Sequence, residues 1–269
     1  MYVVSVPKEL ERNIRSREAF KKAGLDVTFV PAVPHTDPEI PTIFKKDYKR
    51  RCEYSLFLFF KRMVQKAKRE NLPYIILFED DARSTIKNTS QQIDIILKEL
   101  PKDFGLCYLG CYFKKASGGS IEQVSKNLVK LNRDIRPRKY IIWGSHALIL
   151  GRSHYDLILA MFENPTTHIT DAFFASDILN KVPTYAAYPL IFFQTPESCS
   201  SGTSIHRSFN FKGIRAESEA WLESKVKEEN APIKVRRISM EDKHLEGRTR
   251  VAQQEFHRNR ALKSNRRSR

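Results

Sequence analysis

The sequence predicts an α/β fold in which a mostly parallel β-sheet is flanked by helices. Strand-like apolar runs alternate along the chain with segments whose apolar residues recur at helical spacing. Two of these runs, Tyr74–Phe78 and Tyr140–Leu150, are almost continuously apolar, as expected of strands covered on both faces. With 269 residues, of which 41% are hydrophobic, the chain can bury a sizeable core. We therefore predict one α/β domain over residues 1–230 and a separate tail over residues 231–269.

The first part of the chain supplies three strands and two helices to this prediction. Apolar residues at helical spacing, ended in the first case by a glycine suited to a helix C-terminus, define the helices. Four prolines in residues 31–41 predict a loop. In order, we expect a strand at Met1–Val6, a helix at Lys8–Lys22 before Gly24, a strand at Val27–Val30, a helix at Glu53–Glu70 and a strand at Tyr74–Phe78.

The rest of the domain continues the alternation, with one irregular excursion. Gly118 and Gly119, together with many cations, predict a loop over Lys114–Arg138 that recognises substrate. A Gly-Ser-His step interrupts the strand Tyr140–Leu150 and suggests a bulge or a close approach by a ligand. The other expected elements are a helix after Asn88, a strand at Cys107–Gly110, a helix through Tyr155–Phe162, a segment at Asp171–Leu179, an apolar strand at Val182–Phe193 and a helix at Ala216–Glu229.

Three consecutive acids, Glu79, Asp80 and Asp81, end the apolar run Tyr74–Phe78. Ligands of open α/β sheets bind outside the carboxyl ends of the strands, so these acids face the expected site. Packed carboxylates repel one another, and a divalent cation that bridges to a phosphate relieves the repulsion. We expect Asp81 to bind Mn²⁺ or Mg²⁺ and Glu79 or Asp80 to contact the ribose or sugar of a nucleotide-sugar. The alternative is that the acids cap the helix that follows.

A sugar transfer needs a base for the acceptor hydroxyl, and a carboxylate is the usual candidate. Asp171 fits this role, with Asp177 as the second choice, although Asp171 is also placed to cap a helix after Thr170. His146 is a candidate for contacting phosphate or sugar, or else an interior histidine. His206, beyond the last predicted strand, is a candidate for the metal shell.

Charge and composition point to an anionic partner. The net charge is +16, and residues 233–269 contain twelve Lys or Arg against four Asp or Glu, so half of the excess lies in the tail. Such a field attracts nucleic acid, an anionic membrane face or phosphorylated glycans, while a merely solubilising tail is the alternative. Without a secretory signal or a run of about 18 apolar residues, we expect a cytoplasmic protein, peripheral at the inner membrane face. The four cysteines show no zinc-type spacing, which predicts reduced thiols.

The ordered motifs of residues 2–205 resemble glycosyltransferase family 25, which includes bacterial lipooligosaccharide galactosyltransferases. The match includes the acidic triplet and the Tyr108-Leu109-Gly110 strand. The sequence departs from the family at Leu56, where the family commonly has His after Ser, and at Ser198–Gly202. The other matching segments are the Arg12 and Arg15 helix, Gly24–Val33, Cys52–Ser55, Gly144–Ala147, Asp171 and a late Tyr188–Leu190 strand.

The resemblance implies a GT-A-like, Rossmann-like fold and an inverting transfer from a nucleotide-sugar, most often UDP-galactose. It identifies the acidic triplet as the donor and metal motif, and places Arg12 and Arg15 near the nucleotide. Ala32 and Ser145, in two further matching segments, are expected in the donor site.

Three hypotheses follow. The first is a metal-dependent glycosyltransferase that uses a UDP-sugar and acts on a lipooligosaccharide or other surface glycan, with the basic tail at the membrane. The second is a sugar transferase that modifies DNA, since a cationic surface would track phosphates. The third is a non-catalytic basic binding module.

Overall fold

The computed structural model describes residues 1–44, 46–113, 120–132, 142–179, 181–195 and 211–229. These residues belong to one compact unit, Met1–Asn230. The basic tail predicted over residues 231–269 lies outside the described residues, so its predicted roles stay predictions. No helix within the described ranges is long and apolar enough to cross a membrane.

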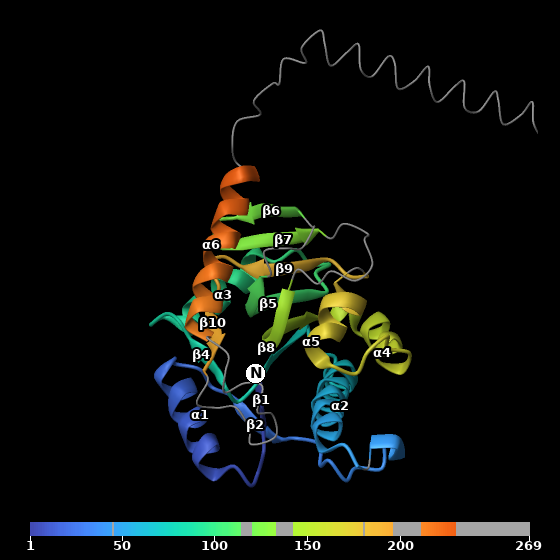
Figure 1. Ribbon diagram of the computed structural model, residues 1–269. Coiled ribbons are helices and arrows are strands. Elements are labelled where there is room, and N and C mark those ends of the chain that lie inside the picture. Colours follow the sequence, from blue (N-terminus) through green and yellow to red (C-terminus); the bar gives the residue numbers. More distant parts are fainter. Residues whose placement is uncertain (45, 114–119, 133–141, 180, 196–210, 230–269) are drawn as a thin grey trace, which may run out of the picture. The chain divides into compact units, whose positions relative to one another are not determined.

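An eight-stranded mixed sheet forms the centre of this unit, in the order β2-β1-β3-β8-β5-β9-β7-β6 (Figure 1). Six of the eight strands run in one direction, and only β7 and β8 oppose them, which confirms the predicted α/β class with a mostly parallel sheet. The strands are β1 (Tyr2–Ser5), β2 (Thr28–Pro31), β3 (Tyr74–Phe78), β5 (Leu106–Phe113), β6 (Ser120–Ser125), β7 (Leu128–Asn132), β8 (Ile142–Gly151) and β9 (Thr184–Ala187). A separate two-stranded sheet pairs β4 (Ala82–Ser84) with β10 (Phe192–Gln194).

Helices cover both faces of the large sheet and give it two hydrophobic cores. Alternate residues of β3 divide between them, since Ile75 and Leu77 join one core and Ile76 and Phe78 the other. The first core also receives residues of α2, α4, α5 and α6, and the second receives residues of α1 and α3. The helices are α1 (Leu10–Lys22), α2 (Tyr48–Arg69), α3 (Thr89–Glu99), α4 (Tyr155–Glu163), α5 (Thr170–Phe173) and α6 (Phe211–Glu229). Short helical turns occur at Thr42–Phe44, Arg152–His154 and Phe174–Ile178.

The helix and strand predictions of the first hundred residues are confirmed to within a few residues at their ends. The strand β3 has the predicted bounds, and α1 ends before Gly24, whose φ of +70° is the left-handed conformation that glycine adopts most readily. The helix α2 is longer than predicted, because it begins at Tyr48, where the Asp47 side chain accepts a hydrogen bond from the Arg50 amide.

Two predictions in the second half are wrong. The excursion over Lys114–Arg138 contains the hairpin of β6 and β7, which continues the sheet beyond β9; residues 114–119 and 133–138 are outside the described part. The apolar run Val182–Phe193 is not one strand, and Tyr188–Leu190 forms no strand. It divides into β9 and β10 in different sheets, because Pro189 has no amide hydrogen to continue the ladder.

The Gly-Ser-His step of β8 marks an irregular pairing, as predicted. Gly144 has a φ of +99°, and the register between β5 and β8 shifts on both sides of Gly110. A Cβ atom at Gly110 would come within 2.5 Å of Nε2 of His146, so only glycine leaves room for the imidazole there. Ser145 and His146 are consecutive residues of this strand, and their side chains point to opposite sides of it.

Candidate active site

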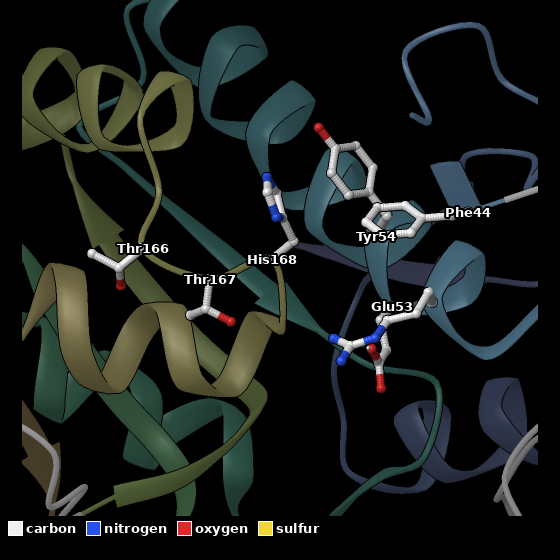
Figure 2. A pocket seen from close by; sticks show the side chains of 7 residues that line it. Phe44, Glu53, Tyr54, Thr166, Thr167 and His168 are labelled. Carbon is white, nitrogen blue, oxygen red and sulfur yellow. Dashed lines mark ion pairs between the residues drawn. The ribbon is translucent and has the colours of Figure 1, made fainter. Parts of the chain in front are cut away.

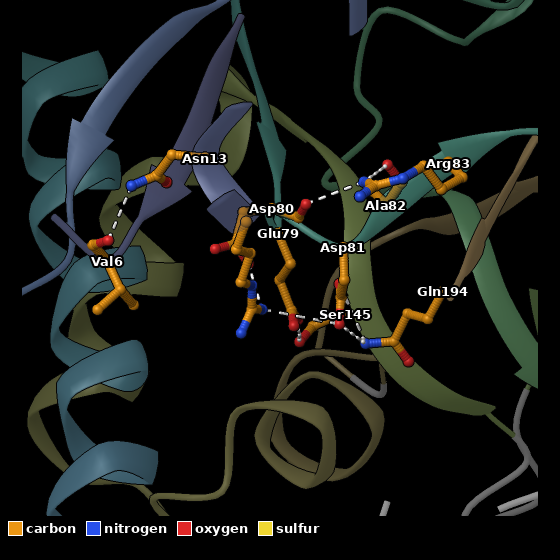
Figure 3. Close-up of polar contacts among 10 residues, drawn as sticks. Val6, Asn13, Glu79, Asp80, Asp81, Ala82, Arg83, Ser145 and Gln194 are labelled. Atoms are coloured by element: carbon orange, nitrogen blue, oxygen red, sulfur yellow. Dashed lines mark hydrogen bonds and ion pairs between the residues drawn. The ribbon is translucent and has the colours of Figure 1, made fainter. Parts of the chain in front are cut away.

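The acidic triplet lies at the carboxyl end of β3, in the turn that leads to β4, as the sequence predicts. The Glu79 amide donates to the His146 carbonyl at 3.0 Å, which fixes the start of this turn against β8. The next helix, α3, begins only at Thr89, so the acids do not cap it. Their side chains instead contact Ser145, Arg12 and Gln194 in turn (Figure 3).

Ser145 joins Glu79 to Asp171. Its Oγ lies 2.8 Å from Oε1 of Glu79 and 2.6 Å from Oδ1 of Asp171, so β3, β8 and α5 meet at one hydroxyl. A serine hydroxyl carries one proton and donates to one carboxylate at a time. The structure therefore brings together the predicted base and one acid of the triplet, 92 positions apart in sequence, through a residue predicted at the donor site.

Asp80 pairs with Arg12, which reaches across from the first turn of α1. The Arg12 guanidinium donates to Oδ1 of Asp80, and its Nη2 also lies 4.0 Å from Oδ2 of Asp81. Only 11% of the Arg12 side chain is exposed. Its Nε and Nη1 atoms, like Oδ2 of Asp80, are buried and have no hydrogen-bond partner in the part of the chain that the structure describes. Buried donors of this kind are normally satisfied, so these nitrogens are available to an anionic ligand.

Asp81 faces residues that sequence reasoning missed. The side-chain Nε2 of Gln194 lies 3.4 Å from Oδ2 of Asp81. The backbone amide of Gln194 donates to the Tyr112 hydroxyl at 3.2 Å. Arg83, the neighbour of the triplet on β4, donates to the backbone carbonyl of Asp80 at 2.9 Å. Gln194 reaches the site because β10 pairs with β4, and no pattern in the sequence indicates that pairing.

Crowding and burial change the protonation of the triplet. Burial raises the pKa of Glu79 well above its usual value, and the charges of Asp81 and Asp171 raise it further. Burial raises the pKa of Asp80 to about 6, against the opposing charge of Arg12. Burial also raises the pKa of Asp81, with Arg12 and Gln194 acting in the opposite sense. Burial therefore favours the protonated, neutral forms of these three carboxyl groups, and a bound cation would oppose this effect.

The other predicted catalytic residues are placed elsewhere. His146 is fully buried on the opposite side of β8 from Ser145, next to the Tyr112 ring, and burial lowers its pKa to about 4. Asp177 accepts from the Thr166 amide at 2.8 Å and from the Thr166 hydroxyl, and so fixes the loop before α5. Within the described residues, neither side chain hydrogen-bonds to the acidic triplet, and both catalytic roles stay predictions.

The remaining predicted donor and metal residues differ in burial. Arg15 is half exposed and pairs with Glu11 at 3.7 Å, one turn from Arg12 on α1. The Ala32 amide donates to the Ser5 carbonyl at 2.8 Å, which places Ala32 at the carboxyl end of β1, the neighbour of β3. His206 and the Ser198–Gly202 segment lie outside the described residues.

The chemistry of the cluster suits a hard divalent cation, since its ligands would be carboxylate oxygens. Within the described ranges, however, no three His, Cys, Asp or Glu side chains are placed to hold a metal ion together. Mg²⁺ is commonly bound by one or two carboxylates together with substrate phosphates. The residues therefore fit a cation that a phosphate ligand would help to bind, and Asp81 as its protein ligand stays a prediction.

No protein-family model and no curated protein matches this chain. The family 25 resemblance is thus not confirmed and stays a prediction. Solved structures with a similar chain path include a glycosyltransferase involved in glycosylation of the major capsid of PBCV-1, with 12% identity, a TM-score of 0.42, and coverage of 83% of this chain and 97% of that chain. Protein A197 from STIV has 12% identity, a TM-score of 0.36, and coverage of 72% and 83%. Apo UDP-glucose pyrophosphorylase has 9% identity, a TM-score of 0.37, and coverage of 79% and 87%.

Proposed function

We propose that this chain is a glycosyltransferase that moves a sugar from a nucleotide-sugar to an acceptor hydroxyl. The observation that carries the proposal is the meeting of Asp171 and Glu79 at the Ser145 hydroxyl, beside the Arg12 pair with Asp80 and Asp81. Transfer of a sugar from a diphosphate requires a base, for which Asp171 is placed. It also requires positive charge beside the leaving phosphate, which the Arg12 guanidinium would supply. These groups meet at the carboxyl end of β3, and α/β proteins bind ligands at the carboxyl ends of their strands.

Arg12 and Asp81 would bind the diphosphate end of the donor. The Nε and Nη1 atoms of Arg12 are buried without partners among the described residues, and charged N–H donors of this kind suit phosphate oxygens. Asp81 would hold Mn²⁺ or Mg²⁺, which when bound compensates the charge that develops on the leaving phosphate. Glu79 would contact the donor sugar, and because burial raises its pKa, its protonated form, which can donate a hydrogen bond, is favoured.

Asp171 would act as the base. Its carboxylate takes the proton of the acceptor hydroxyl, whose oxygen forms a bond to the anomeric carbon of the donor sugar. The bond from that carbon to the phosphate oxygen breaks, and the nucleoside diphosphate leaves with the electron pair. Attack opposite to the leaving group inverts the anomeric carbon. Ser145 holds the Asp171 carboxylate in place for this step.

We propose a UDP-sugar, such as UDP-galactose, as the donor and a lipooligosaccharide or other surface glycan as the acceptor, in the cytoplasm at the inner membrane face. The family resemblance and the net charge of +16 support these choices. The same charge favours a second candidate, in which the acceptor is a hydroxyl on a DNA base. Transfer assays with radiolabelled donor, using glycolipid and DNA acceptors in parallel, separate the two.

The experiment that tests the proposal is donor turnover by the native chain and by Asp171→Asn. Transfer that falls at least about a hundredfold, while the affinity for the nucleotide product is kept, supports Asp171 as the base. Equal turnover by the two proteins contradicts this role.

A further inference from the structure

A cavity of about 230 Å³ opens beside Tyr54 and His168 (Figure 2), and no residue of the acidic triplet lines it. Its walls come from the start of α2, the turn before it, and the loop between α4 and α5. The lining residues are Phe44, Arg50, Glu53, Tyr54, Thr166, Thr167 and His168. Its volume is below the roughly 300–1,000 Å³ of pockets for drug-sized ligands, so it suits a ligand of about one ring.

Aromatic rings form one part of the wall. The rings of Tyr54 and His168 lie 4.7 Å apart at an angle of 35°, and the Phe44 ring lies 6.0 Å from that of Tyr54. Phe57 supports His168 at 5.2 Å. Burial lowers the pKa of His168, so the imidazole is neutral near pH 7. Flat rings that present an apolar face and a polar edge bind ligands of the same mixed character.

Polar groups of both charges complete the wall. Nη1 of Arg50 lies 3.6 Å from Oε2 of Glu53, too far for a hydrogen bond, and that Glu53 oxygen is buried without a hydrogen-bond partner among the described residues. The Thr167 hydroxyl oxygen accepts from the Ile169 amide at 3.2 Å, and its own hydrogen remains available to a ligand. One cation, one anion and hydroxyl groups suit a neutral polyhydroxylated ligand better than a polyanion.

The cavity is tied to the proposed base through the loop that ends in α5. His168 is three residues before Asp171, so their Cα atoms are at most about 11 Å apart. The rings of Phe57 and Phe173 lie 5.1 Å apart and pack α2 against α5. Asp177 fixes the same loop by accepting hydrogen bonds from Thr166. A ligand in the cavity is therefore held by the same packed elements that hold Asp171.

We propose that this cavity binds a neutral sugar ring of the acceptor. Tyr54 and His168 contact the apolar face of the ring, and Arg50, Glu53 and Thr167 hydrogen-bond its hydroxyls. The inference rests on the proposed function, since an acceptor subsite is needed only if Asp171 activates an acceptor hydroxyl.

Binding of simple glycosides tests the cavity directly. Methyl glycosides of galactose, glucose and N-acetylglucosamine are titrated against the native chain, Tyr54→Ala and the milder Glu53→Gln, with saturation-transfer NMR as the readout. Tyr48→Ala is the matched control, because Tyr48 is an exposed tyrosine of the same helix outside the cavity lining. We expect one glycoside to bind, at least tenfold more weakly to Tyr54→Ala, several-fold more weakly to Glu53→Gln, and equally to Tyr48→Ala.

Donor assays distinguish failure of this inference from failure of the proposed function. Two rates are measured: transfer of the sugar onto the bound glycoside, and hydrolysis of the donor. The ratio of transfer to hydrolysis should be at least tenfold lower in Tyr54→Ala than in the native chain. In Tyr48→Ala this ratio should equal that of the native chain. No glycoside binding, or binding that neither cavity variant weakens, overturns the cavity as a sugar site, even if the donor is turned over. Binding of a single-stranded oligonucleotide in place of the glycosides overturns it too. Glycoside binding without any donor turnover overturns the acceptor role and contradicts the proposed function.

Discussion

Oγ of Ser145 lies 2.6 Å from Oδ1 of Asp171, and this contact joins β8 to the first turn of α5. The same hydroxyl lies 2.8 Å from Oε1 of Glu79 at the end of β3. One small side chain on β8 therefore contacts carboxyl groups from two other segments that are far from it in sequence. A shared hydroxyl of this kind orients a carboxylate more strictly than solvent does.

Ser145→Ala should lower transfer kcat about tenfold or more, because Asp171 loses the group that orients its carboxylate. We expect a smaller effect on donor affinity. Kinetics of donor turnover measure the split between kcat and KM. Ser153→Ala is the control, since it removes a serine hydroxyl whose partners are the Phe104 carbonyl and the His154 imidazole rather than a carboxylate. A kcat of Ser145→Ala equal to that of the control would sink the positioning role.

Asp171→Asn and Asp177→Asn should separate the two predicted base candidates. Asp171 faces Ser145, whereas Asp177 binds the backbone and hydroxyl of Thr166. We expect Asp171→Asn to reduce transfer about 10²- to 10⁴-fold with little change in stability. Asp177→Asn should lower the free energy of unfolding by about 1–3 kcal/mol, because a charged hydrogen-bond acceptor is lost. Urea unfolding and turnover assays measure both. The opposite pattern would make Asp177 the base.

Arg12→Met should destabilise the fold by about 3–5 kcal/mol, because it leaves Asp80 buried without its partner. The double variant Arg12→Met, Asp80→Asn should recover most of this loss. Arg15→Met is the control, since Arg15 is half exposed and its pair with Glu11 contributes little. Urea denaturation of the native chain, Arg12→Met, Asp80→Asn and the double variant gives the coupling energy between Arg12 and Asp80. A coupling energy near zero would show that the pair does not stabilise the fold.

The Arg12 variant should also change the pH dependence of stability. Burial raises the pKa of Asp80 to about 6 from an ordinary value of 3.8, so the folded state binds this proton more tightly than the unfolded state. Asp80 therefore contributes stability at low pH that is lost as the pH rises from about 4 to about 6. In Arg12→Met the pKa of Asp80 should rise further, because the opposing charge of Arg12 is gone. The loss of stability with rising pH should therefore continue to a higher pH than in the native chain. A stability profile that has the same shape in Arg12→Met and the native chain would contradict this.

His146 should oppose stability in acid. Burial lowers the pKa of this imidazole to about 4 from 6.5, so the unfolded state takes up the proton first as the pH falls. Its contribution is fully present above about 6.5 and is lost toward pH 4, by about 1.4 kcal/mol for each unit of pKa difference. His146→Gln should reduce the change of the melting temperature with pH over this range. His35→Gln, at an exposed histidine, should leave that pH dependence unchanged. Equal profiles in the two variants would refute the assignment.

Local patterns predicted the acids and the strand that carries them, because a buried strand and its end leave a clear signal in sequence. The apolar run of β3 and the cap of α1 at Gly24 depend on neighbouring residues only. The hairpin of β6 and β7 was missed because the glycines and cations before it outweighed a short alternation of apolar residues. The break between β9 and β10 was also signalled locally, by Pro189.

The contacts within the site were harder to predict. The pairing of Asp80 with Arg12 joins residues 68 positions apart, and Gln194 meets Asp81 across 113 positions. Such contacts depend on which strands become neighbours, and β10 leaves the large sheet for β4. The cavity beside His168 depends likewise on the packing of α2 against α5, which no spacing in the sequence encodes.

The measurement that tests the central claim most directly is hydrolysis and transfer across a panel of nucleotide-sugars, with and without Mn²⁺ or Mg²⁺. The native chain is compared with Asp81→Asn and Asp171→Asn, each shown to be folded by its thermal transition. We expect one donor to be turned over by the native chain in the presence of the metal, with weak product binding in Asp81→Asn and lost transfer in Asp171→Asn. Absence of binding and turnover for every donor, in a folded native chain, would contradict the account.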